Sequence, residues 1–226
     1  MIGSRVPKNM VKSLKMPKIS YATVRRLSRY YRSLDNAEKQ HIATMSSDEL
    51  ARQNHLTAAQ VRKDLSFFGA FGRRGLGYNV SDLKRNIGKI LGLDRTWNVA
   101  VVGVGNIGRA LINFEQFRLQ GFLIKVILDN DPSKIGTRVG DLEIKDMNNI
   151  REEISANKID IGVICVPANA AQKVVDMMVE REGIKAILNF APVSLSVPDG
   201  VTVRYENMAI EIEALSFALT NPETAR

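Results

Sequence analysis

Side chains that carry redox and acid–base chemistry are scarce in this sequence of 226 residues, which contains one cysteine and two histidines. Cys165 has no partner for an internal disulfide, which is typical of a reducing compartment, so we expect a cytoplasmic protein. His41 and His55 both lie in the first half. The second half therefore lacks the side chain most often used in general acid–base catalysis.

Long apolar segments are also absent. No apolar run reaches the ~18 residues that a membrane-spanning helix needs. The basic N-terminus lacks the apolar core of a secretory signal. The composition nevertheless excludes wholesale disorder, because 45% of the residues are hydrophobic and 25% are charged. We therefore expect a globular protein without a membrane partner.

Positive charge is concentrated in the first half of the chain, although the formal net charge is only +8. Residues 1–95 hold 19 Lys and Arg against 7 Asp and Glu, whereas residues 96–226 hold 13 against 17. This asymmetry predicts that the first half contacts a polyanion, with a solvated basic surface as the alternative. Residues 1–17 show no sustained periodicity, and we interpret them as a flexible basic tail.

Capping signals predict a helix-turn-helix in the first half. A helix that begins after Ser20 is expected first. Ser46 and Glu49 then have the spacing of a capping box, and Thr57 and Gln60 repeat this spacing. Two short capped helices joined by a tight turn describe a helix-turn-helix motif.

The second helix of this motif has one apolar and one polar face. Val61, Leu65 and Phe68 recur at helical spacing and predict the buried face. The opposite face carries small, basic and hydrogen-bonding residues, which suit a helix in the major groove of DNA. An ordinary amphipathic helix with a solvated face is the alternative. The candidate DNA contacts on and beside this helix are Thr57, Gln60, Arg62, Lys63 and Ser66.

The following segment, residues 71–78, has three glycines around two arginines. Because glycine permits tight turns, we expect a β-hairpin that forms the wing of a winged helix, with a plain surface hairpin as the alternative. Arg73 and Arg74 are expected to contact phosphates or to enter the minor groove, and Tyr78 is a further candidate DNA contact. Residues 81–95 predict a linking helix.

A glycine motif opens the second half of the chain. An apolar strand is predicted over residues 98–102, and Gly103, Gly105 and Gly108 follow it before a helical stretch. This order of strand, glycines and helix is typical of dinucleotide-binding domains. The first two glycines allow a tight turn and close approach to a pyrophosphate, and the third allows the helix to pack closely on the strand.

An acidic residue follows the next predicted strand. Asp129 comes directly after residues 124–128 and lies 21 positions beyond Gly108. A carboxylate in this position accepts hydrogen bonds from the adenosine ribose and repels a 2′-phosphate, which predicts NAD(H) rather than NADP(H). The alternative is that Asp129 only begins the turn at Pro132.

The remaining pattern predicts an α/β fold. Strands over residues 159–166 and 184–189 and a helix over residues 170–182 continue a doubly wound parallel sheet of the Rossmann type. Ligands of such sheets bind beyond the carboxyl ends of the strands, so Pro167 and residues 189–192 are candidate pocket walls. The candidate cofactor-binding residues from these patterns are Gly103, Gly105, Asn106, Ile107, Gly108, Asp129, Pro167, Asn189 and Pro192.

The final helix is apolar on several sides, which predicts that it packs against a partner subunit as a dimer seam or by exchange. Docking onto its own domain is the alternative. The expected fold is thus an N-terminal winged helix-turn-helix, a Rossmann doubly wound parallel sheet and a C-terminal, domain-swapped helix. The expected limits are 1–17 for the tail, 18–84 for the DNA-binding domain, 85–95 for a linker helix, 96–206 for the NAD(H)-binding domain and 207–226 for the dimerisation helix.

This order of parts resembles the Rex family of bacterial redox-sensing transcriptional repressors. The resemblance covers about residues 18–221, and its most specific stretches are 58–78 (AAQVRKDLSFFGAFGRRGLGY), 103–110 (GVGNIGRA), 166–172 (VPANAAQ) and 189–192 (NFAP). It implies a homodimer that binds an inverted-repeat operator, with one recognition helix in each major-groove half-site. It also implies that NADH releases the protein from DNA, whereas NAD+ competes for the same site and leaves repression in place.

Two positions depart from the pattern that the resemblance implies. Many relatives place an acid near the start of the terminal helix, paired with an arginine that matches Arg32, but Asn207 stands at the acidic position. Many also place a tyrosine where this chain has Phe114. We therefore assign Arg32 and Asn207 to allosteric coupling and hypothesise that the charge-based switch is absent or rewired. By resemblance, Phe114 and Val166 join the candidate cofactor-binding residues.

Two other functions remain as alternatives. The first is an NAD-dependent dehydrogenase with a basic accessory domain, which turnover of a small carbonyl or alcohol would reveal. The second is a CoA-binding module, because the Rossmann half also resembles nucleotide-binding domains of acyl-CoA ligases. Asp129 argues mildly against the second. No pattern predicts a catalytic residue or a metal site, and we expect that the protein is not an enzyme.

Overall fold

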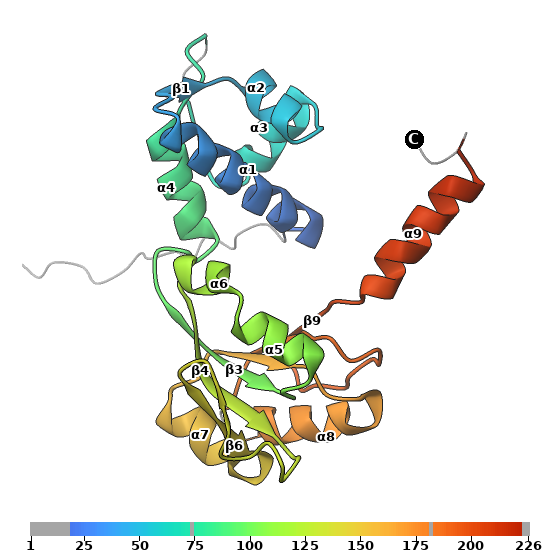
Figure 1. Ribbon diagram of the computed structural model, residues 1–226. Coiled ribbons are helices and arrows are strands. Elements are labelled where there is room, and N and C mark those ends of the chain that lie inside the picture. The colour runs from blue at the N-terminus through green and yellow to red at the C-terminus, as the bar shows by residue number, and fades with distance from the viewer. Residues whose placement is uncertain (1–18, 73–74, 181–182, 223–226) are drawn as a thin grey trace, which may run out of the picture. The chain divides into compact units, whose positions relative to one another are not determined.

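The computed structural model describes residues 19–72, 75–180 and 183–222 (Figure 1). The chain divides into two compact units, of which the first ends at Asp94 and the second begins at Arg95. The expected basic tail over residues 1–17 lies outside the described residues. In the part of the chain that the structure describes, no helix is long and apolar enough to span a membrane.

The first unit contains helices and one short antiparallel ladder of two strands. Its elements are α1 (Tyr21–Lys39), β1 (Thr44–Met45), α2 (Ser47–Gln53), α3 (Ala58–Ser66), β2 (Tyr78–Asn79) and α4 (Val80–Ile90). The helices α2 and α3 are separated by a short turn at His55, which adopts a left-handed backbone conformation with φ of 55°. The predicted helix-turn-helix is therefore present.

The caps of these helices follow the sequence signals closely. Ser20 accepts a hydrogen bond from the N–H of Thr23, as predicted for the start of α1. Ser46 and Glu49 form a complete capping box at α2. At α3, the Thr57 side chain accepts from the N–H of Gln60. The Gln60 side chain does not return this bond, because it donates to a buried carboxylate one turn further along the helix.

The helices α1, α3 and α4 share one apolar core. Leu27, Leu34, Val61 and Ile87 are fully buried within it. The helix α4 was expected to be part of a linker over residues 85–95, but its apolar side packs against α1 inside the first unit. It therefore belongs to the first unit and ends only a few residues before the boundary between the units.

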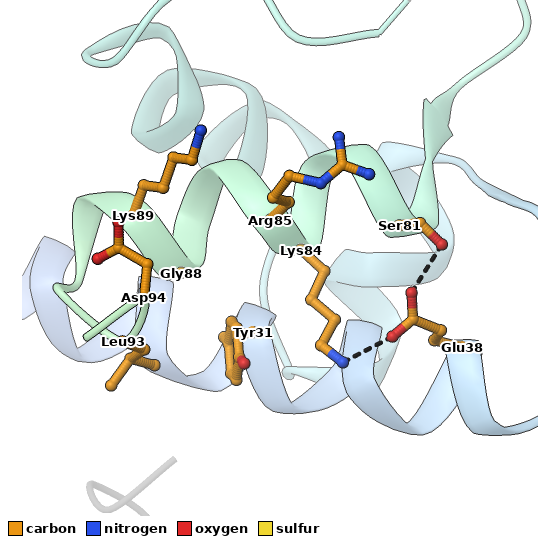
Figure 2. A pocket seen from close by; sticks show the side chains of 9 residues that line it. All are labelled: Tyr31, Glu38, Ser81, Lys84, Arg85, Gly88, Lys89, Leu93 and Asp94. Atoms are coloured by element: carbon orange, nitrogen blue, oxygen red, sulfur yellow. Dashed lines mark hydrogen bonds and ion pairs between the residues drawn. The ribbon is translucent and has the colours of Figure 1, made fainter. Parts of the chain in front are cut away.

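Polar contacts at the rim of the same packing join α1 to α4. Lys84 of α4 donates to Glu38 of α1 across 2.6 Å, and the Ser81 hydroxyl donates to the other oxygen of this carboxylate (Figure 2). The Tyr31 ring lies in the same groove, close to Gly88. A Cβ at Gly88 would lie 3.2 Å from this ring, so a small residue lets the two helices approach.

The predicted wing segment is joined to the rest of the unit by β2. Tyr78 and Asn79 pair with Met45 and Thr44 of β1. The strand partner is therefore far away in the sequence, not in an adjacent hairpin arm, and the next residue already begins α4. The two ends of the wing loop still lie side by side, because a Cβ at Gly72 would come within 2.7 Å of the carbonyl oxygen of Gly77.

The second unit is built on a sheet whose described strands have the order β5-β6-β4-β3-β7-β8-β9. All neighbours are parallel except the antiparallel pair of β5 and β6. Without β5, this is the Rossmann strand order, whose direction of winding switches between β3 and β7. The strands are β3 (Trp97–Val102), β4 (Phe122–Asp129), β5 (Arg138–Val139), β6 (Leu142–Asp146), β7 (Ile161–Ile164), β8 (Ala186–Asn189) and β9 (Thr202–Tyr205).

Helices cover both faces of this sheet (Figure 1). Alternate residues of β3 point to opposite faces. Val99 and Val101 belong to the core on the α5 side, which includes Leu111. Ala100 and Val102 belong to the core on the side of α7 and α8. The helices of the second unit are α5 (Asn106–Ile112), α6 (Glu115–Leu119), α7 (Ile150–Ala156), α8 (Ala168–Val179) and α9 (Met208–Thr220), and a 3-10 turn (Met147–Asn149) precedes α7.

The terminal helix α9 buries none of its residues in this chain. Its large apolar side chains are between 56% and 84% exposed. A helix that is hydrophobic on all sides is not stable against water unless something covers it. The exposed residues are Met208, Ile210, Ile212, Leu215, Phe217 and Leu219.

Candidate dinucleotide site and nucleic-acid interface

The glycines after β3 form a turn that excludes side chains where the backbone is crowded. Gly103 has φ of 94°, and a Cβ there would lie 2.5 Å from the carbonyl oxygen of Cys165. A Cβ at Gly108 would overlap the carbonyl oxygen of Gly103. At Gly105, by contrast, a Cβ would meet nothing within 4 Å. Gly103 and Gly108 thus serve the packing of the turn, whereas Gly105 faces open space.

Asp129 is the last residue of β4 and is only 6% exposed. Its carboxylate accepts from the N–H of Val104 at 2.8 Å, from the N–H of Asp131 at 3.0 Å and from Nζ of Lys134 at 3.1 Å. Burial alone would raise the pKa of Asp129, but these donors outweigh it and hold the pKa below its ordinary value. The group therefore remains a carboxylate at neutral pH.

A cavity of about 690 Å³ lies beyond the carboxyl ends of β3, β4 and β7, where the strand order switches direction. Its volume is within the range of small-molecule and cofactor sites. The structure brings together seven of the predicted cofactor residues around it. These are Gly103, Gly105, Ile107, Asp129, Val166, Pro167 and Pro192.

Four predicted cofactor residues do not line the cavity, and for Asn189 the predicted contact with a ligand needs a correction. Asn189 is fully buried, and its amide bonds the backbone of Ala191 and Val193, so it shapes the loop after β8 rather than contacting a ligand. Gly108 packs against the turn, as described above. Asn106 begins α5 with an exposed side chain.

Phe114, the fourth, is 51% exposed at the N-cap of α6. Its ring makes an edge contact with the Phe117 ring, with the centroids 5.2 Å apart. This pair lies outside the lining of the cavity. A role of Phe114 in ligand binding stays a prediction from the family resemblance.

The structure adds lining residues that the sequence patterns did not single out. Lys134 and Met147 lie at the β4 and β6 side of the cavity, and Asn169 and Phe190 lie at the β7 and β8 side. Lys134 forms ion pairs with both Asp129 and Asp131. Lys134 follows Asp129 by only five positions, in the loop after β4, and this closeness was the sequence feature that could have identified it.

Cys165 also lines the cavity, but its chemistry is suppressed. Burial raises the pKa of this thiol to about 12, so it is protonated at neutral pH. A protonated, partly buried thiol is a poor nucleophile. This argues against thiol-based sensing at this position.

In the first unit, the polar face of α3 is open to solvent, as predicted. Arg62, Lys63 and Ser66 are exposed. Arg62 donates to the Ser47 hydroxyl at 2.8 Å, which directs its guanidinium toward the start of α2. Among the described residues, the Lys63 ammonium forms no ion pair. Thr57 is exposed, but its hydroxyl is used as the cap of α3.

The remaining predicted DNA contacts have different outcomes. Tyr78 is only 7% exposed and belongs to the apolar core, and burial raises the pKa of its hydroxyl. We therefore correct its assignment from DNA contact to core residue. An aromatic ring directly after a glycine-rich stretch gives no sequence signal that separates these roles. Arg73 and Arg74 lie outside the described residues.

A buried carboxylate that the sequence reading missed lies behind the polar face of α3. Asp64 is fully buried, and Arg26 of α1 contacts both of its oxygens, at 2.6 and 2.7 Å. The Tyr30 hydroxyl and the Gln60 amide also donate to it. Burial opposes ionisation, but these donors keep the pKa of Asp64 below its ordinary value. The sequence feature that could have identified Asp64 is its place three residues after Val61, on the face of the helix that was predicted to be buried.

The two residues assigned to allosteric coupling lie in different units. Arg32 is exposed on α1. Asn207 is the N-cap of α9, and its side chain accepts from the N–H of Ala209 at 3.0 Å. Their pairing therefore stays a prediction.

Comparison with known proteins identifies the family. The family described as "Putative DNA-binding protein N-terminus" matches residues 18–66, and the family described as "CoA binding domain" matches residues 94–193. The redox-sensing transcriptional repressor Rex of Desulfitobacterium hafniense is 47% identical over 92% of this chain and 97% of its own length. The chain belongs to the Rex family. Rex of Clostridium acetobutylicum is 42% identical over 94% of this chain and 99% of its own.

Solved structures of the Rex-family repressor RSP agree with this assignment. RSP in complex with β-NAD+ and operator DNA has a TM-score of 0.86 and 42% identity, covering 91% of this chain and 94% of RSP. RSP in complex with β-NADH has a TM-score of 0.82 and 40% identity, covering 91% and 96%. The predicted family and the predicted fold class are thus confirmed. Relatives of this kind are transcriptional regulators.

Proposed function

We propose that this chain is a Rex repressor that binds an inverted-repeat operator as a homodimer and is released by NADH, with NAD+ competing for the same site. The observation that carries the proposal is the likeness over nine-tenths of the chain to RSP, whose structures contain operator DNA with β-NAD+ in one case and β-NADH in another. Both the helix-turn-helix and the dinucleotide cavity described above are needed for such a protein.

The cavity residues fit a dinucleotide. The open space at Gly105 permits a pyrophosphate to approach the backbone, and Ile107 lies beside it. Asp129, an ionised acceptor at the end of β4, suits the adenosine ribose hydroxyls. We assign the nicotinamide side of the site to Val166, Pro167 and Pro192. When bound, the dinucleotide supplies a ring whose charge and planarity depend on its oxidation state.

The DNA-binding surface is assigned to the polar face of α3 and the following wing. Arg62 and Lys63 are exposed cations that suit phosphate contacts, and Gln60 suits a base edge. We assign Arg73 and Arg74 to the flanking minor groove. The domain limits follow from this assignment, with residues 18–94 as the DNA-binding domain, because α4 packs inside the first unit.

Dimerisation is assigned to α9. Its apolar side chains are exposed all round, and a second copy of the chain offers a matching surface. A dimer places two copies of α3 against two half-sites, which accounts for an inverted-repeat operator.

The two ligands act on each other through linkage. If NADH binds better to the form of the dimer that binds DNA poorly, each ligand weakens the binding of the other by the same factor. A tenfold effect requires only ~1.4 kcal/mol of differential binding. NAD+, which lacks this differential, occupies the same cavity without releasing DNA.

Fluorescence anisotropy of a labelled inverted-repeat duplex tests the proposal. We expect tight binding that NADH reverses and that excess NAD+ protects. Binding that is indifferent to both nucleotides would contradict the sensing role. Steady oxidation of NADH with a small carbonyl would favour the dehydrogenase alternative, and displacement of NADH by CoA would favour the CoA-binding alternative.

A further inference from the structure

The polar face of α3 contains one side chain whose orientation is set from inside the protein. Gln60 is half-buried at the edge of this face, one turn before Asp64. Its Nε2 donates to Oδ1 of Asp64 across 2.8 Å. Because Asp64 is fully buried, the amide of a candidate DNA contact is tied to the interior of the domain.

The surroundings of Asp64 decide which end of the amide faces it. Oδ1 accepts from Nη2 of Arg26 as well as from Gln60. Oδ2 accepts from Nε of Arg26 and from the Tyr30 hydroxyl. An ionised carboxylate has no hydrogen to donate. The NH2 group of Gln60 must therefore face Asp64, and the amide oxygen is directed away from it.

From this geometry we propose that Asp64 is a positioning residue that fixes the Gln60 amide to read an adenine in each operator half-site, an inference that rests on the proposed function. After donating one N–H to Asp64, Gln60 keeps one N–H and its carbonyl oxygen. Adenine presents an N7 acceptor and an N6 donor in the major groove, which this pair matches. Guanine presents two acceptors there, so it leaves the amide oxygen without a donor.

The fixed orientation separates Gln60 from its neighbours on α3. Lys63 is exposed on a flexible stem, which suits a phosphate but carries little sequence information. A free glutamine amide turns over between two orientations, with its donor and acceptor exchanged. Asp64 holds the Gln60 amide in one orientation before DNA binds. This makes Gln60 selective and reduces the loss of side-chain entropy on binding.

The first experiment measures base preference position by position. A binding sequence is selected with the wild-type protein from randomised inverted-repeat duplexes, and each half-site pair is then replaced symmetrically. We expect a preference for A·T at one position of about tenfold, and Gln60→Ala should reduce it to below about twofold while other positions keep theirs. Replacing that adenine by 7-deazaadenine, which lacks N7, should weaken the wild type and leave Gln60→Ala unaffected.

A second pair of variants separates positioning from folding. Asp64→Asn offers the Gln60 amide either a donor or an acceptor, so we expect the adenine preference to fall by severalfold. Tyr30→Phe removes a hydrogen bond from the same carboxylate without touching Gln60. It should lower the midpoint of urea unfolding and leave the adenine preference unchanged.

A measurement on the wild-type protein stands even if Asp64→Asn does not fold. In the NMR spectrum of the free protein, the side-chain NH2 of Gln60 should have a high order parameter. The NH2 of Gln53, exposed at the end of α2, provides the matched mobile reference. Equal mobility of the two amides would overturn the proposal.

Other outcomes also overturn it. These are a Gln60→Ala variant that keeps every base preference, or a Tyr30→Phe variant that loses the adenine preference as fully as Asp64→Asn. Failure of the wild type to bind any selected duplex, or binding indifferent to NADH, would instead contradict the proposed function. The two failures are therefore distinguishable.

Discussion

Asp64 in the first unit and Asp129 in the second are two carboxylates almost free of solvent, and they are stabilised in different ways. In both cases burial would raise the pKa, and hydrogen-bond donors lower it below the ordinary value. Asp64 accepts four hydrogen bonds from three side chains, with Arg26 bound to both oxygens. Asp129 is held by two backbone N–H groups and by Lys134.

The source of the donors indicates what each carboxylate does. Asp64 accepts hydrogen bonds from two helices and lines no described cavity, so it links α1 to α3. Asp129 receives backbone donors at the end of a strand and faces a cavity, so a ligand can add to its hydrogen bonds. Similar burial and a similar pKa direction therefore accompany contacts between two helices in one unit and a position on the wall of a cavity in the other.

The comparison is tested most strongly by removing Arg26, the cation that pairs with Asp64 in the first unit. Arg26→Ala leaves the Asp64 charge buried without its partner, so we expect the free energy of unfolding to fall by about 3 kcal/mol. Urea unfolding followed by far-UV circular dichroism measures this loss. The control is Arg32→Ala, an exposed arginine on the same helix, which should change stability little. Equal effects of the two variants would show that the ion pair of Arg26 with Asp64 does not stabilise the first unit.

Removing the carboxylate of the second unit should affect binding more than stability. Asp129→Ala loses hydrogen bonds from a charged acceptor to the ribose, so we expect NADH affinity to fall by about 2 kcal/mol, or about 30-fold. Isothermal titration calorimetry measures the affinity. Asp146→Ala is the control, because this acid ends the adjacent strand β6 without lining the cavity. An unchanged affinity of the Asp129 variant would refute the ribose assignment.

The same contrast between inward and outward groups applies to cations. Arg26 points to the interior, whereas Lys63 is exposed on α3. We expect Lys63→Ala to weaken binding to all duplexes alike and to reduce the slope of log affinity against log salt by about one. Lys89→Ala, an exposed lysine on α4, should leave this slope unchanged. A slope that is the same in Lys63→Ala and wild type would exclude Lys63 from the phosphate contacts.

The two sites also differ in how far the sequence predicted them. The dinucleotide site depends on local spacing, because Gly103, Gly105 and Asp129 follow strands that can be identified from their apolar residues. The sheet places these strand ends together. The antiparallel β5 and the edge strand β9 were not predicted, since β5 contains only two residues and β9 is short and largely exposed.

The hydrogen bonds and the ion pair of Asp64 with α1 join residues that are far apart in the sequence. Arg26 and Asp64 are separated by 38 positions, and no local pattern relates them. Tyr78 was misassigned for the same reason, because its burial depends on packing against helices distant in the chain. The sequence therefore predicted the glycine turn and the position of Asp129 from local spacing. It missed the burial of Asp64 and Tyr78, which depends on tertiary contacts.

A third carboxylate, which the family pattern would place at the start of α9, is absent from this chain, and restoring it gives the smallest expected effect. Asn207→Asp keeps a side chain that caps α9, because aspartate and asparagine are equally good N-caps. The substitution therefore adds charge without disturbing the helix end. We expect it to increase the ratio of NADH to NAD+ affinity by at most about fivefold, as for an exposed ion pair worth up to about 1 kcal/mol.

Two further variants decide whether that gain arises from pairing with Arg32. Asn207→Ser keeps the cap without the charge, so the affinity ratio should stay at its wild-type value. Combining Asn207→Asp with Arg32→Ala should abolish the gain, because the new carboxylate then lacks its cation. If the gain persists without Arg32, the carboxylate acts on the nucleotide through another group. If Asn207→Asp leaves the ratio unchanged, the switch of this chain does not depend on charge at the start of α9.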